Sequence, residues 1–125
     1  MPSVANAIAH AACSTAHDLG ATAIINFTRT GNSARMISSY RPKCPIICCT
    51  EVEKKFYQMS MSWGLLPVMA QEQSNTDELF AHAVERAKST GLVKPGDLTV
   101  LTAGVPVGVS GSTNILKAHV ISENV

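Results

Sequence analysis

The segment AIINF–TRTGNS–ARMISSY, residues 23–40, decides the fold of this chain. Ala23–Phe27 is an apolar run of strand length, and nearly continuous apolar runs are typical of strands buried on both faces of a parallel sheet. Six small, polar or basic residues follow, and then a short segment with apolar residues at helical spacing. The pattern predicts a strand, a loop and the start of a helix, which is the repeating unit of an α/β domain.

The loop between that strand and helix has the chemistry of an anion cradle. Hydroxyl side chains offer hydrogen bonds, Gly31 lets backbone amides turn outward, and Arg29 adds positive charge. Ligands of open parallel sheets bind at the carboxyl ends of strands, where helix N-termini accept anions. We therefore predict a phosphate site at Thr28, Arg29, Thr30, Gly31, Asn32 and Ser33. The alternative is an ordinary turn and helix cap, which use the same residue types.

Length and composition limit what the rest of the chain can be. A chain of 125 residues, with 46% hydrophobic and 15% charged residues, fits one well-buried α/β domain over residues 1–125. The net charge of +1 implies neither nucleic acid nor a membrane as partner. No apolar run reaches the roughly 18 residues of a membrane span, and residues 1–19 do not resemble a signal peptide. We expect a cytoplasmic protein.

The cysteines and histidines do not form a metal-binding pattern. Cys13, Cys44, Cys48 and Cys49 include no Cys-x-x-Cys pair, so we expect reduced, buried cysteines on strands and no metal site. His10 and His17 lie seven residues apart, on one side of a predicted helix. Two imidazoles are too few for a metal or catalytic site, so we expect them at the surface or in an interface.

The element order predicts three layers, α/β/α, around a mostly parallel five-stranded sheet whose last strand is antiparallel. We expect the apolar face of the first helix to hold Val4, Ile8, Ala11, Ala12, Thr15 and Leu19. The proline in the third strand predicts an edge strand. The predicted helices are Ser3–Leu19, 34–40, one beginning at the capping box of Thr50–Glu53, and Thr76–Thr90; the strands are Thr22–Phe27, Ile46–Thr50, Leu65–Met69, Leu98–Thr102 and Asn114–Ile121.

Four motifs resemble one family. TRTGNSAR (28–35) resembles the Thr-x-Ser/Thr-Gly-x-Ser/Thr-Ala-Arg loop of the pyruvate kinase C-terminal domain, and YRPKCPI (40–46) its Tyr-Arg-Pro-x-x-Pro-Ile. WGLLPV (63–68) resembles its Trp-Gly-Val-x-Pro, and TAGVPVGVSGSTN (102–114) completes the match in a bacterial-type form. The resemblance covers nearly the whole chain. The chain is similar to the regulatory domain alone, as an excised domain would be.

The resemblance implies regulation, not catalysis, for these residues. The family's catalytic (β/α)₈ barrel, which holds phosphoenolpyruvate, magnesium, potassium and nucleotide, has no motif here, so we expect no catalytic residue, no cofactor and no kinase activity of the chain by itself. The Thr28–Ser33 loop resembles the one that holds the 6-phosphate of fructose 1,6-bisphosphate. The loop that closes over the sugar corresponds to Val109, Ser110, Gly111, Ser112 and Thr113. Implied partners are a phosphorylated effector, the barrel and further copies in a tetramer.

One departure leaves the effector open. Relatives activated by fructose 1,6-bisphosphate often carry a tryptophan, and an arginine for the second phosphate, in the region corresponding to Gln71–Leu79, which here has neither. Ribose 5-phosphate, AMP or another sugar phosphate is as plausible as the bisphosphate. A free-standing sugar-phosphate-binding or assembly domain is the alternative function. The alanine-rich first helix and the last strand, if it lies at an edge, predict weak dimerisation of the chain.

Overall fold

The computed structural model describes residues 4–27, 32–50, 64–71, 76–104 and 113–121. Helix α1 (Val4–Leu19) precedes strand β1 (Ala23–Phe27), helix α2 (Asn32–Ser39) and strand β2 (Ile46–Thr50). Strand β3 (Leu65–Met69) and helix α4 (Thr76–Ser89) lead to strands β4 (Leu98–Gly104) and β5 (Thr113–Val120). The predicted helix that begins at the Thr50–Glu53 capping box lies outside the described residues.

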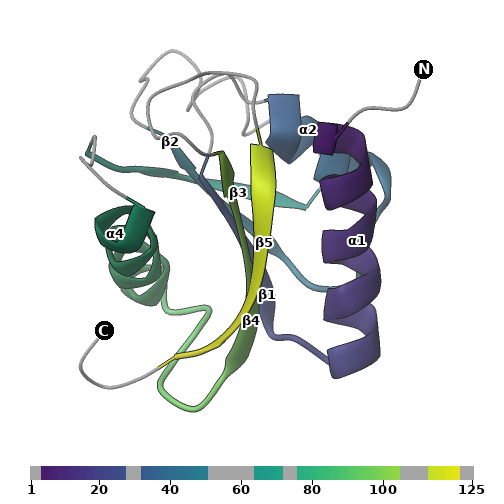
Figure 1. The fold of residues 1–125 in the computed structure, drawn as a ribbon. Coiled ribbons are helices and arrows are strands. Elements are labelled where there is room, and N and C mark those ends of the chain that lie inside the picture. The colour runs from purple at the N-terminus through teal and green to yellow at the C-terminus, as the bar shows by residue number, and fades with distance from the viewer. Residues whose placement is uncertain (1–3, 28–31, 51–63, 72–75, 105–112, 122–125) are drawn as a thin grey trace.

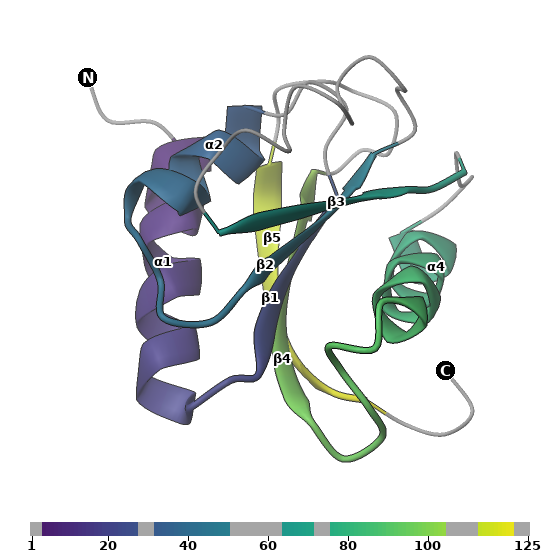
Figure 2. The same ribbon diagram turned by 180° about the vertical axis from the view of Figure 1, so that it is seen from behind.

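The strands form one five-stranded sheet in the order β3-β2-β1-β4-β5. The pairs β1–β2, β1–β4 and β2–β3 are parallel, and β4–β5 is antiparallel. The antiparallel pair was expected because the sequence shows no pattern of a crossover helix between the last two strands. Helices α1 and α2 lie on one side of the sheet and α4 on the other, which gives the three expected layers (Figures 1 and 2). Strand β3 is an edge strand, as its Pro67 predicts, and β5 is the other edge.

The central strands are apolar because both of their faces are covered. Every residue of β2 is buried, and in β1 only Phe27 is partly exposed. Alternate side chains of β1 enter different cores: Ile25 packs in the cluster beneath α4, and Ile24 packs in the cluster beneath α1 and α2. Burial on both faces explains the continuous apolar run that the sequence shows at 23–27.

The buried face of α1 differs from the predicted one. The residues that pack on the sheet are Ala9, Ala12 and Ala16, exposed by only 2%, 0% and 3%, whereas Leu19 is 50% exposed. The predicted face included Ala12, which is buried, but it also included the exposed Leu19 and left out Ala9 and Ala16. The helix meets the sheet through its smallest side chains, because alanine lets a helix backbone approach closely. Ala9, Ala12 and Ala16 thus serve packing within the chain.

Two other expectations need correction. Strand β4 runs two residues beyond Thr102, because Ala103 and Gly104 still pair with Ile115 and Thr113 of β5 across a bulge. All four cysteines are free, but only Cys48 and Cys49 are buried on a strand. The half-buried Cys13 and Cys44 lie on α1 and on the α2–β2 connection.

The turns at two helix ends follow from backbone geometry. Gly20 ends α1 in the left-handed region, at φ 65°, and the Ala21 amide donates to the Ala16 carbonyl in a Schellman motif. Arg41 occupies the equivalent place after α2 at φ 52°, although it has a Cβ atom. A left-handed arginine is strained, because Cβ crowds the backbone in that conformation.

Candidate functional site

The carboxyl ends of β1 and β4 form the topological switch point of the sheet. The chain leaves β1 through α2, on one face of the sheet, and enters β2, which is one neighbour of β1. The other neighbour of β1 is β4, which the chain reaches from α4 on the opposite face. Connections that leave adjacent strands in opposite directions open a crevice at the carboxyl edge, where ligands of doubly wound sheets bind. The strand order therefore favours a ligand site at the carboxyl end of β1, where the segment that follows β1 begins.

The structure describes part of the predicted phosphate site. Thr28, Arg29, Thr30 and Gly31 lie outside the described residues, between the end of β1 at Phe27 and the start of α2 at Asn32. Asn32 and Ser33 form the first turn of α2, so the helix begins two residues before the predicted start at residue 34. The predicted segment thus connects the carboxyl end of a central strand to a helix N-terminus.

The second predicted loop is anchored at the same edge. Val109, Ser110, Gly111 and Ser112 lie outside the described residues, but Thr113 begins β5 and pairs with Gly104, the last residue of β4. Strand β4 lies directly beside β1 and runs parallel to it. The tertiary structure therefore brings the anchors of two segments far apart in the sequence to neighbouring strand ends.

The electrostatics of this edge suit an anion. The unpaired amides in the first turn of a helix, together with its macrodipole, act as about half a positive charge. The first turn of α2 contains no acidic side chain that would oppose a bound anion. These properties favour a phosphate or carboxylate over a cation at the start of α2.

A buried polar row lies beneath the site and was not predicted. Cys48, Asn26 and Thr102 are register partners on β2, β1 and β4, and each is exposed by 1% or less. The Asn26 Nδ2 atom donates to Thr102 Oγ1 at 2.7 Å, and the Cys48 thiol donates to Asn26 Oδ1 at 3.9 Å. Burial raises the pKa of the Cys48 thiol, which keeps it protonated as a donor. The available signal was an asparagine within the apolar run 23–27.

Side chains of α4 also fix the carboxyl end of β3. The backbone amide of Gln71 donates to His82 Nε2 at 3.0 Å, and Arg86 Nε donates to the Met69 carbonyl at 2.9 Å. His82 and Arg86 are one helical turn apart, so they meet the strand end from the same side of α4. Because β3 is paired on one side only, these bonds secure the point where the chain leaves the sheet.

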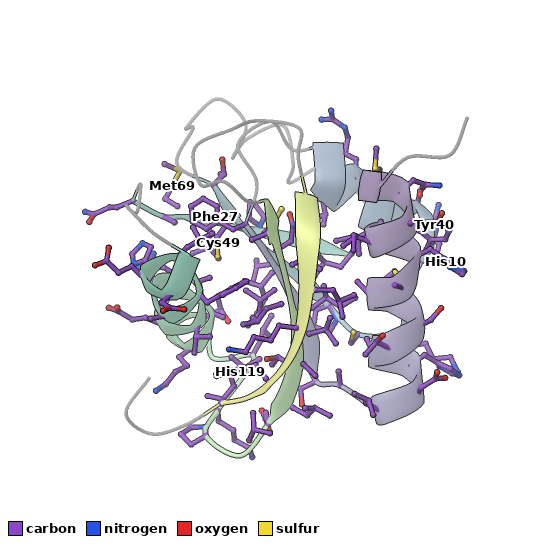
Figure 3. The ribbon with its side chains drawn as sticks, viewed as in Figure 1. His10, Phe27, Tyr40, Cys49, Met69 and His119 are labelled. Atoms are coloured by element: carbon purple, nitrogen blue, oxygen red, sulfur yellow. The ribbon has the colours of Figure 1, made fainter. Side chains whose placement is uncertain are left out.

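A cleft of about 790 Å³ lies at the other end of the strands, where β1 and β2 begin. It is bounded by α1 from His10 onward and by the 40–45 connection. In Figure 3, His10 and Tyr40 lie near each other beside α1, and their ring centroids are 5.3 Å apart. Basic residues line this cleft, but α1 and α2 both end there, and helix C-termini carry partial negative charge. Basic side chains at such ends offset the helix dipoles, so this cleft suits an anion less well than the start of α2 does.

The thiols at that cleft are poor nucleophiles. Burial, with a smaller effect of the nearby Cys44, raises the pKa of Cys13 to about 11, and burial likewise raises the pKa of Cys44. A thiol with a raised pKa is protonated at neutral pH and reacts slowly.

The described residues contain neither a cluster of metal ligands nor a helix that could span a membrane. Within the described ranges, no group of three or more histidine, cysteine, aspartate or glutamate side chains is arranged to hold a metal ion. None of the helices in the described part of the chain combines the length and hydropathy needed to cross a bilayer.

The fold defines the class: an α/β domain with a helix N-terminus at the topological switch point of its sheet. Comparison with known proteins names the family. Residues 6–119 match the family model "Pyruvate kinase, alpha/beta domain", and the chain belongs to that family. This confirms the resemblance that the four sequence motifs indicated.

The curated relatives are bacterial pyruvate kinases. The chain is 48% identical to pyruvate kinase of Clostridium acetobutylicum over 109 residues, which cover 87% of the chain and 23% of that protein. It is 46% identical to the enzyme of Lactobacillus delbrueckii subsp. bulgaricus over 118 residues (94% and 20%) and 43% identical to that of Geobacillus stearothermophilus over 120 residues (96% and 20%). The chain spans about a fifth to a quarter of the length of these relatives.

Proposed function

We propose that this chain is the regulatory domain of a pyruvate kinase and that it binds a phosphorylated small molecule at the carboxyl edge of its sheet. The phosphate contacts are Thr28, Arg29, Thr30, Gly31, Asn32 and Ser33, and the sugar contacts are Val109, Ser110, Gly111, Ser112 and Thr113. The observation that carries the proposal is the position of the α2 N-terminus at the β1/β4 switch point.

A sugar or nucleotide monophosphate is as good a candidate as fructose 1,6-bisphosphate. A second phosphate needs its own cation, and residues 71–79 contain neither arginine nor lysine. Leu79, at the end of that region, lies in α4 and is only 2% exposed. The loop around Thr28–Ser33 holds one phosphate well, so we expect the bisphosphate to gain little from its second group.

Calorimetry on the 125-residue chain tests the site. We expect inorganic phosphate, ribose 5-phosphate, AMP or fructose 1,6-bisphosphate to bind with micromolar to millimolar affinity, because three or four charge-assisted hydrogen bonds contribute roughly 1.5–3 kcal/mol each before desolvation and ordering costs. Replacing both Thr30 and Ser33 by alanine should weaken binding roughly ten-fold or more, at about 1 kcal/mol per lost bond. Equal binding by the double variant, or no binding below about 10 mM, would mean that the loop is only a helix cap.

In the whole enzyme we assign catalysis to other residues. From the family resemblance we propose that the whole enzyme transfers a phosphoryl group from phosphoenolpyruvate to ADP in glycolysis, giving pyruvate and ATP in the cytoplasm, with magnesium and potassium. Such transfer needs metal-bound phosphates aligned with an acceptor. Among the described residues, no three or more histidine, cysteine, aspartate or glutamate side chains are grouped so that they could hold a metal ion. We therefore place those ions in a catalytic barrel and expect the chain alone to be inactive. Turnover of phosphoenolpyruvate by the purified chain in a coupled assay would contradict this assignment.

We also propose that the domain takes part in oligomerisation, as a tetramer in the whole enzyme and as a weak dimer alone. Strand β5 is an edge strand, and its Val120 is 57% exposed. An edge strand can pair with a second copy across a two-fold axis. Sedimentation that shows only monomer at hundreds of micromolar would count against it. A free-standing binding or assembly domain is the alternative, and an open reading frame for a barrel upstream of Met1 would decide against that alternative.

A further inference from the structure

We infer that Asn26 and Thr102 are positioning residues of the proposed effector site: their buried side-chain bond holds the ends of β1 and β4, and the first turn of α2, in the geometry that phosphate binding requires. This inference rests on the proposed function. It concerns residues that contact no ligand themselves, because both side chains are buried within the domain.

The first observation is the place of the bond in the sheet. Asn26 pairs with Thr102 in the last register pair of the parallel β1–β4 ladder. Beyond this pair, β1 continues for one residue and β4 for two, and there the described parts of both strands end. The side-chain bond of 2.7 Å therefore closes the ladder at the point where the two chains separate to form the switch point.

The second observation links this bond to α2. In β1, Asn26 lies on the same face as Ile24, which packs in the cluster beneath α1 and α2. Cys48, which donates to Asn26 Oδ1, packs against Ala34, the third residue of α2. The polar row thus runs from β4 through β1 to the residue of β2 that supports the first turn of α2.

The third observation is chemical. An amide in an apolar interior costs stability unless it is hydrogen-bonded, and a bond between groups 76 residues apart in sequence requires one relative placement of their strands. Leucine or valine at position 26 would pack on the apolar face without that requirement. Asn26 contributes less hydrophobic stabilisation than an apolar residue would, but its hydrogen bond fixes the placement of β1 relative to β4. A site assembled from two strand ends needs such a fixed placement.

The test is a single isosteric substitution with a matched control on the same strand. Thr102→Val keeps the side-chain shape and removes the acceptor of the Asn26 amide. Thr99→Val makes the same change three residues earlier in β4, where it removes a buried hydroxyl that donates to the His119 carbonyl at 2.9 Å. Thr102→Ser keeps the hydroxyl. Urea unfolding of the 125-residue chain measures the stability of each variant, and calorimetry with ribose 5-phosphate and with inorganic phosphate measures binding.

We expect Thr102→Val to weaken binding of ribose 5-phosphate about ten-fold, the equivalent of one misaligned charge-assisted hydrogen bond. The Thr99→Val variant should lose a comparable amount of stability but bind ribose 5-phosphate as tightly as the unchanged chain does. The Thr102→Ser variant, which keeps the hydroxyl, should also bind as tightly as the unchanged chain. Equal affinity of the Thr102→Val and Thr99→Val variants would overturn the inference and leave the proposed function intact. Failure of the unchanged chain to bind either probe would overturn the proposed function and this inference with it.

A measurement on the unchanged chain covers the case in which Thr102→Val does not fold. In an NMR titration with ribose 5-phosphate, the side-chain amide of Asn26 should shift together with the backbone amides of Asn32 and Ser33. Shifts of the backbone amides with a stationary Asn26 side chain would refute the coupling.

Discussion

Replacing Ala12 by leucine tests how α1 meets the sheet. Ala12 is completely buried, and the side chains in its cluster include Ile24, Ile46 and Val100, each also fully buried. Three additional carbon atoms have no space at this contact, so the helix must move away from β1 and β4 or the side chains must leave their preferred rotamers. The expected result is loss of stability, although leucine and alanine are both good helix formers.

The magnitude follows from the packing. Overfilled cores lose about 1–3 kcal/mol after the hydrophobic gain of the larger side chain is included. For a chain of this size, each kcal/mol lowers the melting temperature by about 4 °C, so a fall of about 4–12 °C is expected. Thermal and urea unfolding, followed by circular dichroism, measure both quantities.

Two control variants separate the observed face of α1 from the sequence-predicted one. Ala7→Leu adds the same atoms at an exposed position and should change stability by less than about 0.5 kcal/mol. Leu19→Ala should also have a small effect, because Leu19 is half exposed; a leucine in the core would lose about 2–5 kcal/mol. If Ala12→Leu were neutral, or if Leu19→Ala were as costly as a core substitution, the packing of α1 described above would be wrong.

Two further predictions concern the ionisation of His119 and the backbone at Arg41. Burial, with a smaller effect of the Lys117 charge, lowers the pKa of His119, so the folded chain resists a proton that the unfolded chain accepts. Stability should therefore fall as the pH drops through the ordinary imidazole range near 6.5, and His119→Gln should reduce the loss seen by urea unfolding between pH 7.5 and 5.5. Equal losses would contradict the burial of an Nε2 atom that has no hydrogen-bond partner among the described residues. Arg41→Gly should stabilise the chain by about 0.5–1 kcal/mol because glycine tolerates a φ of 52°, whereas Arg41→Ala keeps the strain and should not; a loss with glycine would show that the arginine side chain contributes more than its backbone costs.

Much of the fold was predictable because local sequence and tertiary environment agree in the centre of the sheet. The apolar run 23–27 predicted a strand buried on both faces, and β1 is buried except for the partly exposed Phe27. Residues 46–50 were predicted as a strand, and β2 has these bounds and is buried throughout. Pro67 predicted the edge position of β3, and the lack of a helical pattern in the sequence at 103–113 predicted the antiparallel pairing of the last two strands. Family motifs indicated the pyruvate kinase domain, and the family match confirms it.

The sequence by itself determined the order of the described elements and the family of the domain, because these depend on periodicity, turn residues and local motifs. Which face of α1 is buried depended on the tertiary structure, because Ala9, Ala12 and Ala16 become a contact surface only where the sheet lies opposite them. The bonds from Asn26 to Thr102 and from Gln71 to His82 also depended on it. Each joins separate elements, and no local pattern encodes which partner the strand order β3-β2-β1-β4-β5 will place within hydrogen-bond reach.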